Sequence, residues 1–180
     1  MTRWVALLRG INVGGARPVP MKPLRAGLEG LGFGNVESYV ASGNVAFDAP
    51  AKGDHARAIE ELVAKEFGHD DVPVVAVRKP DLERIAKDNP YDDDDAEPTK
   101  VYVGFYLDGA PTAAGAKKLA AVEAPGEHVT VGKHAMYVAY AEGMGRAKLT
   151  SSVIESKLGV RVTFRNLRTV RKLLAMCEKR

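Results

Sequence analysis

Cysteine, aromatic residues and long apolar runs are all scarce in this chain of 180 residues. The single cysteine, Cys177, excludes an intramolecular disulfide, so we expect a reducing compartment, the cytoplasm. No apolar run approaches the roughly 20 residues of a membrane-spanning helix, and no signal-peptide stretch precedes the first strand pattern. The four histidines are scattered, with none at zinc-ligand spacing from Cys, Asp or Glu. We therefore expect no membrane partner, no metal and no cofactor.

Charge is ordinary in amount but uneven in distribution. Charged residues make up 27% and hydrophobic residues 46% of the chain, as in a folded globular protein. The net charge of +3 combines +4 over residues 1–31, −9 over residues 32–145 and +8 over residues 146–180. Basic ends that met in the fold would form a positive face for anionic partners. Alternatively, the basic and acidic segments neutralise each other and form an ordinary solvated surface.

Runs of β-branched and aromatic residues between turn residues predict eight strands. Two hairpins are expected, with tight turns at Ser42-Gly43 and Gly132-Lys133. The predicted strands are Trp4–Arg9, Val36–Ala41, Asn44–Asp48, Val72–Lys79, Val101–Leu107, His128–Val131, Met136–Ala141 and Val160–Arg165.

Apolar stripes at helical spacing predict helices between these strands. Asp54 is expected to cap the N-terminus of one helix. Ser152 and Glu155 have the spacing of a capping box at the start of another. The last helix runs from Asn166 and places Cys177 on its apolar face, where we expect the thiol to be buried and inert.

The order of these elements predicts an α+β fold made of two similar halves. Residues 1–79 read β-α-β-β-α-β, residues 100–165 repeat that order, and a helix closes the chain. This is the order of ferredoxin-like units, whose mainly antiparallel sheets carry helices on one face. We expect a first α+β subdomain at 1–79, a linker with a short helix and an acidic loop at 80–99, and a second subdomain with the C-terminal helix at 100–180.

The first candidate functional segment is Arg9 to Gly15, RGINVGG, called the first loop below. Glycine and asparagine tolerate left-handed backbone conformations and close ligand approach, and an arginine fork suits carboxylate or phosphate. The spacings of the phosphate-binding Walker motif and of the dinucleotide fingerprint are both absent, so neither ATP nor NAD binding is supported. A connection shaped only by tight packing explains these residues equally well.

The second candidate is Glu142 to Thr150, EGMGRAKLT, called the second loop. Hydroxyl groups from Thr150 onward can cap the helix that follows, or can share a phosphate with Arg146 and Lys148. Capping does not explain two cations ahead of a helix N-terminus, where the helix dipole disfavours positive charge. Such an inconsistency is typical of functional sites and favours a functional role.

The last predicted helix carries a basic face at Arg165, Arg168, Arg171 and Lys172. This face could follow a nucleic-acid backbone, although an ordinary solvated helix face is the simpler interpretation. Aromatic residues for base stacking are sparse. The nearest lie on one strand, at Tyr102, Phe105 and Tyr106, and Phe105 is expected to pack in the core.

Four motifs spread over the chain carry a resemblance. They are RGINVGG at Arg9–Gly15, SGNV at Ser42–Val45, GMGRAKLT at Gly143–Thr150 and TFRNLRTVRKL at Thr163–Leu173. By these motifs the chain resembles the bacterial family known as domain of unknown function 1697. Ala147 stands where that family usually has serine, which argues against a nucleophilic serine at this position. Leu167 stands where the family usually has tryptophan, which weakens a stacking role there. The resemblance implies a two-part α+β fold and brings no established reaction.

Our preferred hypothesis is a cytoplasmic protein that binds an anionic ligand, either a phosphate-bearing small molecule or nucleic acid, between the two loops. One alternative is an enzyme acting on a phosphorylated or carboxylated substrate, for which no general base is evident. Another is a module that assembles through its opposite charges. The sequence assigns no catalytic residue and leaves the oligomeric state open. The predicted ligand-binding residues are Arg9, Asn12, Gly14, Gly15, Ser42, Asn44, Gly145, Arg146, Lys148, Thr150, Arg165, Asn166 and Lys172.

Overall fold

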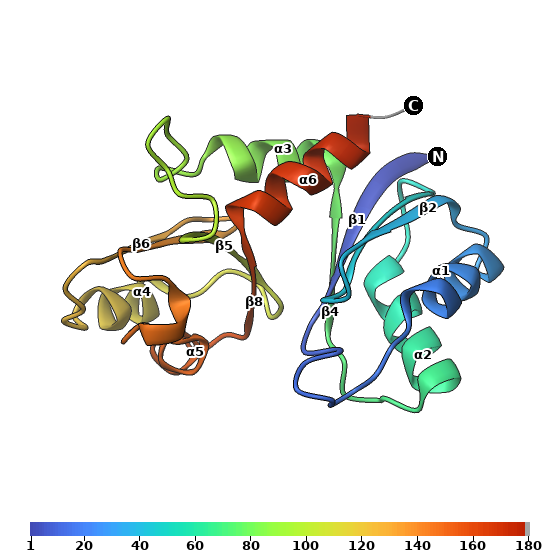
Figure 1. Cartoon of the computed structure of the whole chain (residues 1–180), viewed down its shortest axis with the longest axis horizontal. Helices are drawn as coiled ribbons and strands as arrows, with labels where there is room; N and C mark the ends of the chain where they lie inside the picture. The colour runs from blue at the N-terminus through green and yellow to red at the C-terminus, as the bar shows by residue number, and fades with distance from the viewer. Residues whose placement is uncertain (179–180) are drawn as a thin grey trace. The chain divides into compact units, whose positions relative to one another are not determined.

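A computed structural model describes residues 1–178 and divides the chain into two compact units (Figure 1). The first unit comprises Met1–Glu83 together with the chain from Lys172 onward, and the second comprises Arg84–Arg171. These divisions fall inside two helices, whereas the sequence suggested a linker at residues 80–99. The difference arises because helix ends join a unit through contacts with residues far away in the sequence.

The first unit contains a four-stranded sheet in the order β2-β3-β1-β4, in which all neighbouring strands are antiparallel. Figure 1 shows α1 and α2 on the same face of this sheet. Its elements are β1 (Thr2–Leu8), α1 (Met21–Gly30), β2 (Gly34–Tyr39), β3 (Asn44–Ala49), α2 (His55–Phe67), β4 (Val74–Arg78) and the start of α3 (Lys79–Lys87).

The second unit repeats this topology with the sheet order β6-β7-β5-β8, again antiparallel throughout. Its helices α4 and α5 share one face of the sheet (Figure 1). The elements are β5 (Val101–Tyr106), α4 (Ala113–Ala120), β6 (Glu127–Val131), β7 (Met136–Tyr140), the 3₁₀ turn η1 (Met144–Arg146), α5 (Ser151–Leu158), β8 (Val162–Asn166) and the start of α6 (Leu167–Glu178).

The predicted fold class is therefore confirmed, with two ferredoxin-like units and the predicted order of elements. Each predicted strand is present, with ends displaced by at most two residues. Such agreement is expected where alternation and apolar stripes mark long, strongly patterned elements.

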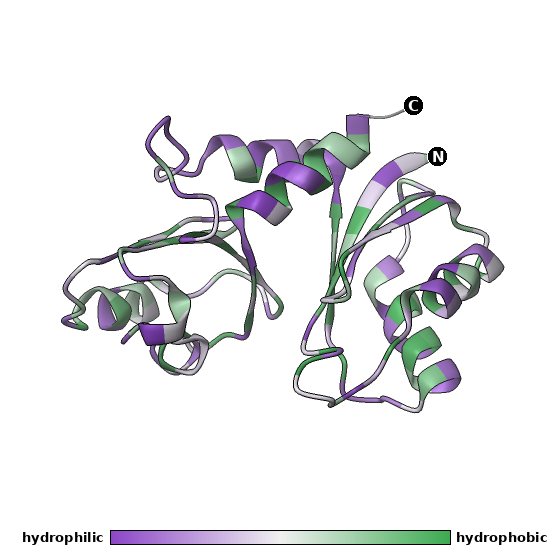
Figure 2. Cartoon of the chain, in the orientation of Figure 1, coloured by the Kyte–Doolittle hydropathy of each residue, from purple (hydrophilic) through white to green (hydrophobic). Residues whose placement is uncertain are grey.

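The core of the first unit lies between its sheet and the two helices. Alternate residues of β1, among them Trp4 and Leu8, face this core together with Phe47 of β3. Leu28 of α1 and Ile59 of α2 complete it and are fully buried. In Figure 2 hydrophobic and hydrophilic residues alternate around α1 and α2, as expected of helices with one buried face.

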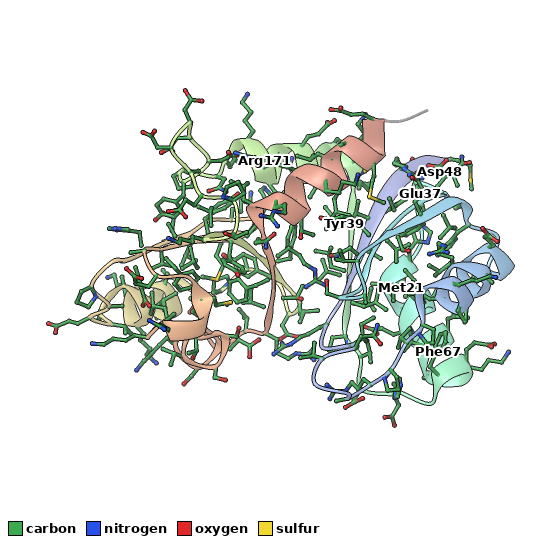
Figure 3. The ribbon with its side chains drawn as sticks, viewed as in Figure 1. Met21, Glu37, Tyr39, Asp48, Phe67 and Arg171 are labelled. Atoms are coloured by element: carbon green, nitrogen blue, oxygen red, sulfur yellow. The ribbon has the colours of Figure 1, made fainter. Side chains whose placement is uncertain are left out.

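The opposite face of this sheet carries a buried arginine. The Arg3 side chain is only 3% exposed and donates to Glu37 Oε1 at 2.7 Å and to the Met176 carbonyl at 3.2 Å. Asp48 Oδ1 lies 3.5 Å from Arg3 Nη1 (Figure 3 labels Glu37 and Asp48). The guanidinium thus joins β2, β3 and the end of α6. Next to Met176, Cys177 is buried as predicted, and burial raises the pKa of its thiol.

The second unit has a matching core between its sheet and α4 and α5. Met136 and Val138 of β7 and Ile154 of α5 are fully buried in it. Two glycines permit close packing within each layer. A Cβ on Gly104 of β5 would lie 2.6 Å from Met136 Cγ of β7, and one on Gly115 of α4 would lie 2.7 Å from the Leu158 carbonyl oxygen of α5. Contacts between neighbouring strands and between the two helices therefore require glycine at these positions.

The predicted helix caps agree with the structure in part. The Asp54 carboxylate accepts from the Arg57 N–H, as predicted, and at Asn166, where the last helix was expected to begin, Oδ1 accepts from the Thr169 N–H at 2.9 Å. The capping box at Ser152 and Glu155 is wrong. Thr150 caps α5 instead, and the Glu155 carboxylate accepts from the N–H of Val162 in β8 at 2.9 Å.

Both predicted two-residue hairpin turns are longer than expected. β2 ends at Tyr39, so residues 40–43 form the first turn, and residues 132–135 form the second. In the first, Val40 adopts a φ of 50°, a left-handed conformation that is costly for a β-branched side chain. The sequence did not reveal this turn because valine carries a strand propensity, not a turn propensity.

Candidate anion-binding loops

In the first loop, Asn12 shapes the chain. Its φ is 55°, its Oδ1 accepts from the Val19 N–H at 2.7 Å, and its Nδ2 donates to the carbonyls of Val19 at 2.9 Å and Ala41 at 2.7 Å. The amide thereby closes the loop and ties it to the β2–β3 turn. The signal for this role was the asparagine itself, because asparagine tolerates left-handed conformations and bonds nearby backbone.

The SGNV motif lies against the same loop. Gly43 has a φ of 91°, and a Cβ there would lie 2.9 Å from Leu8 Cβ. Its carbonyl accepts from the Leu8 N–H at 2.8 Å. Asn44 is fully buried and donates to Ser42 Oγ at 3.0 Å and to the Tyr39 carbonyl at 3.1 Å. Two motifs distant in sequence thus meet at one end of the first unit's sheet.

The remaining residues in and near the first loop include an ion pair, two left-handed glycines and a backbone hydrogen bond. The Arg17 guanidinium pairs with Asp71, and this contact holds the pKa of the Asp71 carboxyl below its usual value. Gly14 and Gly15 have φ of 58° and 76° and open space where a Cβ would be. The Arg9 N–H donates to the Pro73 carbonyl at 2.9 Å.

In the second loop, backbone N–H groups bind a carboxylate of the protein itself. Glu127, at the start of β6, accepts from the Lys148 N–H at 2.7 Å through Oε1 and from the Leu149 N–H at 3.0 Å through Oε2. The Tyr140 hydroxyl donates to the Leu149 carbonyl at 2.7 Å. Two consecutive N–H groups that share one carboxylate form an anion-binding backbone arrangement. No local pattern marks Glu127, so sequence reasoning missed it.

The cationic side chains of the second loop are open to solvent. Arg146 and Lys148 are exposed, and neither side chain forms a hydrogen bond or ion pair with any of residues 1–178. Thr150 Oγ1 accepts from the Val153 N–H at 3.3 Å, which confirms its capping role. Gly145 is exposed within η1 and has open space at its Cβ position.

The basic face predicted on the last helix is partly neutralised. Arg171 pairs with Asp92, and the Lys172 ammonium lies 5.8 Å from the centre of the Tyr39 ring in the first unit. Arg165 Nη1 donates to Thr163 Oγ1 at 3.0 Å and to the Phe164 carbonyl at 2.9 Å. Burial lowers the pKa of Arg165 to about 10.

The candidate stacking residues on β5 serve the fold. Phe105 is 1% exposed, as predicted for the core. Tyr102 makes an edge contact with Tyr140, with ring centres 5.7 Å apart, and the Tyr106 hydroxyl donates to the Gly132 carbonyl at 2.8 Å. These contacts leave the strand little capacity to stack on bases.

The duplicated topology provides a counterpart for each connection. The β1–α1 connection spans residues 9–20, and its counterpart between β5 and α4 spans only 107–112. The β7–α5 connection spans 141–150, against 50–54 between β3 and α2. At each of these two positions, the shorter connection joins the same two elements with about half as many residues as the longer one. The lengthened connections are the two that contain the first and second loops, and loops longer than the fold needs often carry function.

The first loop lies in the first unit and the second loop in the second, so a shared ligand stays a prediction. Within residues 1–178, no group of three or more His, Cys, Asp or Glu is placed to hold a metal ion. No helix in that range has both the length and the apolar character needed to cross a membrane.

These features define an α+β protein of two ferredoxin-like units with one lengthened loop in each. Comparison with known families places it more closely: a family model described as protein of unknown function, DUF1697, matches residues 1–137, and the chain belongs to this family. The matched region includes the first loop and SGNV but ends before the second loop.

Solved structures also match the chain, and one of them resembles it over its whole length. It is a conserved bacterial protein, SP0830 from Streptococcus pneumoniae, at 25% identity and a TM-score of 0.78. The likeness covers 98% of this chain and 99% of that one, so the fold extends over both units. No curated protein matches the chain.

Proposed function

We propose that the protein binds a small phosphate-bearing anion at its second loop. The observation that carries this proposal is the pair of exposed cations, Arg146 and Lys148, without a partner among residues 1–178, in a loop whose backbone already holds a carboxylate. Cations with no structural partner at the start of a helix need another reason to be there, because the helix dipole disfavours them. A bound anion would supply that reason.

The dipole of α5 supports the same ligand. Thr150 satisfies the Val153 N–H, and the positive end of the helix lies directly after the loop. A phosphate near Ser151 would gain from this partial charge, from a forked contact with Arg146 and from the point charge of Lys148. Glu127 holds the backbone of the loop in one shape, so less ordering accompanies binding.

A small ligand is favoured over nucleic acid by the state of the last helix. Arg171 is already paired with Asp92, and Lys172 lies over Tyr39. The tyrosines of β5 are engaged in the fold rather than presented for stacking. A long polyanion would need several such cations at once, whereas a single phosphate needs only the second loop.

The test is titration of the protein with inorganic phosphate and with pyrophosphate, followed by amide chemical shifts. We expect shifts centred on residues 143–152, and we expect Arg146→Ala and Lys148→Ala each to weaken binding by about tenfold, the loss of one charge-assisted contact. Lys133→Ala is the matched control, since Lys133 is an exposed cation on the β6–β7 turn of the same unit.

Two results would contradict the proposal. One is the absence of shifts in residues 143–152 with either anion. The other is an equal loss of affinity in Lys148→Ala and Lys133→Ala, which would indicate only a general effect of charge. A single-stranded oligonucleotide that binds more tightly than pyrophosphate, with a steep decline in salt, would instead favour nucleic acid.

A further inference from the structure

The second unit contains a cavity whose lining is acidic, in contrast to the cationic second loop. Its volume is about 360 Å³, within the range of small-molecule sites. Val101 of β5, His128 of β6 and Ala139 of β7 line it from the sheet. Their sequence neighbours Tyr102, Val129 and Val138 belong to the core beside α4 and α5, so by strand alternation Val101, His128 and Ala139 face away from those two helices.

The other wall is the acidic segment between α3 and β5. The Tyr91 hydroxyl bonds to Thr130 Oγ1 of β6 at 2.8 Å, and the Tyr91 N–H donates to Asn89 Oδ1 at 3.0 Å. Asp92 pairs with Arg171. The Tyr91–Thr130 contact therefore holds the start of the segment to the sheet, and the Asp92–Arg171 pair ties it to α6.

The charge of the lining is negative. Lys100 is the one lysine or arginine among the lining residues, and its ammonium lies 3.1 Å from Glu97 Oε1, so these two charges cancel. Asp93 and Asp95 also line the cavity, and neither carboxylate pairs with a cation among residues 1–178. Asp93 Oδ1 accepts from the Asp95 N–H, which fixes the two residues relative to each other.

We propose that this cavity binds a small organic cation. Its ammonium or guanidinium group would lie beside Asp93 and Asp95, and its short apolar body would cover Val101 and Ala139. An organic cation fits better than a bare metal ion, because the described residues offer no group of three metal ligands and the sheet side of the cavity includes apolar side chains. Asp93 and Asp95 are exposed, so their attraction for a cation is greatest at low salt.

The test compares n-butylamine with 1-butanol, two probes of similar size that differ in charge. Amide chemical shifts recorded at low salt should move at the cavity residues with the amine and not with the alcohol. The double variant Asp93→Asn with Asp95→Asn removes the charge and keeps the shape, and we expect it to weaken amine binding by about tenfold. Asp94→Asn is the matched control, because Asp94 is exposed in the same segment and does not line the cavity.

A second variant tests the cavity itself. Ala139→Leu fills the floor without changing charge, and we expect it to abolish amine binding while the rest of the spectrum stays folded. Equal binding of 1-butanol and n-butylamine would overturn the proposal, as would unchanged affinity in the double asparagine variant or in Ala139→Leu. Shifts with the amine that avoid the cavity residues would overturn it as well.

Discussion

The contact between Glu127 and the second loop offers a direct test of how that loop is held. We consider Glu127→Ala, which removes the carboxylate that accepts the Lys148 and Leu149 N–H groups. Both N–H groups then have to find water. The Lys148 N–H is exposed and does so at little cost, whereas the Leu149 N–H is partly buried beside a side chain that is only 2% exposed.

The expected magnitude follows from these two environments. A hydrogen bond to a charged group contributes about 1.5–3 kcal/mol, and less where water replaces it easily. We therefore expect Glu127→Ala to lower the free energy of unfolding by about 2 kcal/mol. Glu127→Gln keeps one acceptor oxygen but no charge, and should cost about half as much.

Urea unfolding followed by far-ultraviolet circular dichroism measures the change, and hydrogen exchange of the Lys148 and Leu149 amides locates it. Trp4 fluorescence provides a separate signal from the first unit, where little change is expected. Glu142→Ala is the control, because Glu142 is exposed in the same loop and has no partner among residues 1–178. The reasoning is refuted if the two variants agree within about 0.5 kcal/mol and both amides exchange at wild-type rates.

Two further predictions concern strain and alkaline pH. Val40→Gly should raise the free energy of unfolding by about 1 kcal/mol, because it relieves a left-handed valine that is already 51% exposed. Val13→Gly, also at an exposed valine, should show no such gain in urea unfolding. A Val40→Gly variant that is less stable than the wild type would contradict the argument. Burial raises the pKa of Tyr137 to about 12, above the value of about 10 in an unfolded chain, so its contribution to stability is complete below pH 10 and is lost as the pH rises toward 12. Unfolding measured from pH 9 to 12 should therefore show a decline that is shallower in Tyr137→Phe, and identical slopes would exclude this role.

Local signals accounted for the elements but not for all of their ends. Asp54 was recognised as a helix cap from its residue type and position, and it bonds an N–H three residues ahead. Asn166, expected only as the start of the last helix, makes the same kind of bond. Glu155 was misassigned for the opposite reason. Its carboxylate bonds the N–H of Val162 beyond the helix, so a spacing that suits a capping box serves a different contact here.

The candidate site shows the same division between local and distant contacts. Asn12 was predicted to bind a ligand, and the structure shows its side chain bonded to the backbone of the loop and of the β2–β3 turn. Arg146 and Lys148 stood out because cations are unfavourable at a helix start. Glu127 and the cavity beside the acidic segment escaped notice, because each depends on residues brought together by strand pairing and by loop contacts across the sheet.

By itself, the sequence determined the α+β class, the repeated order of strands and helices, and two conspicuous loops, since periodicity and turn chemistry act over a few residues. Only the tertiary structure decided which carboxylate binds the backbone of the second loop, which cations form ion pairs and which remain exposed. Those outcomes depend on side chains that are far apart along the chain, and no local pattern encodes how they meet.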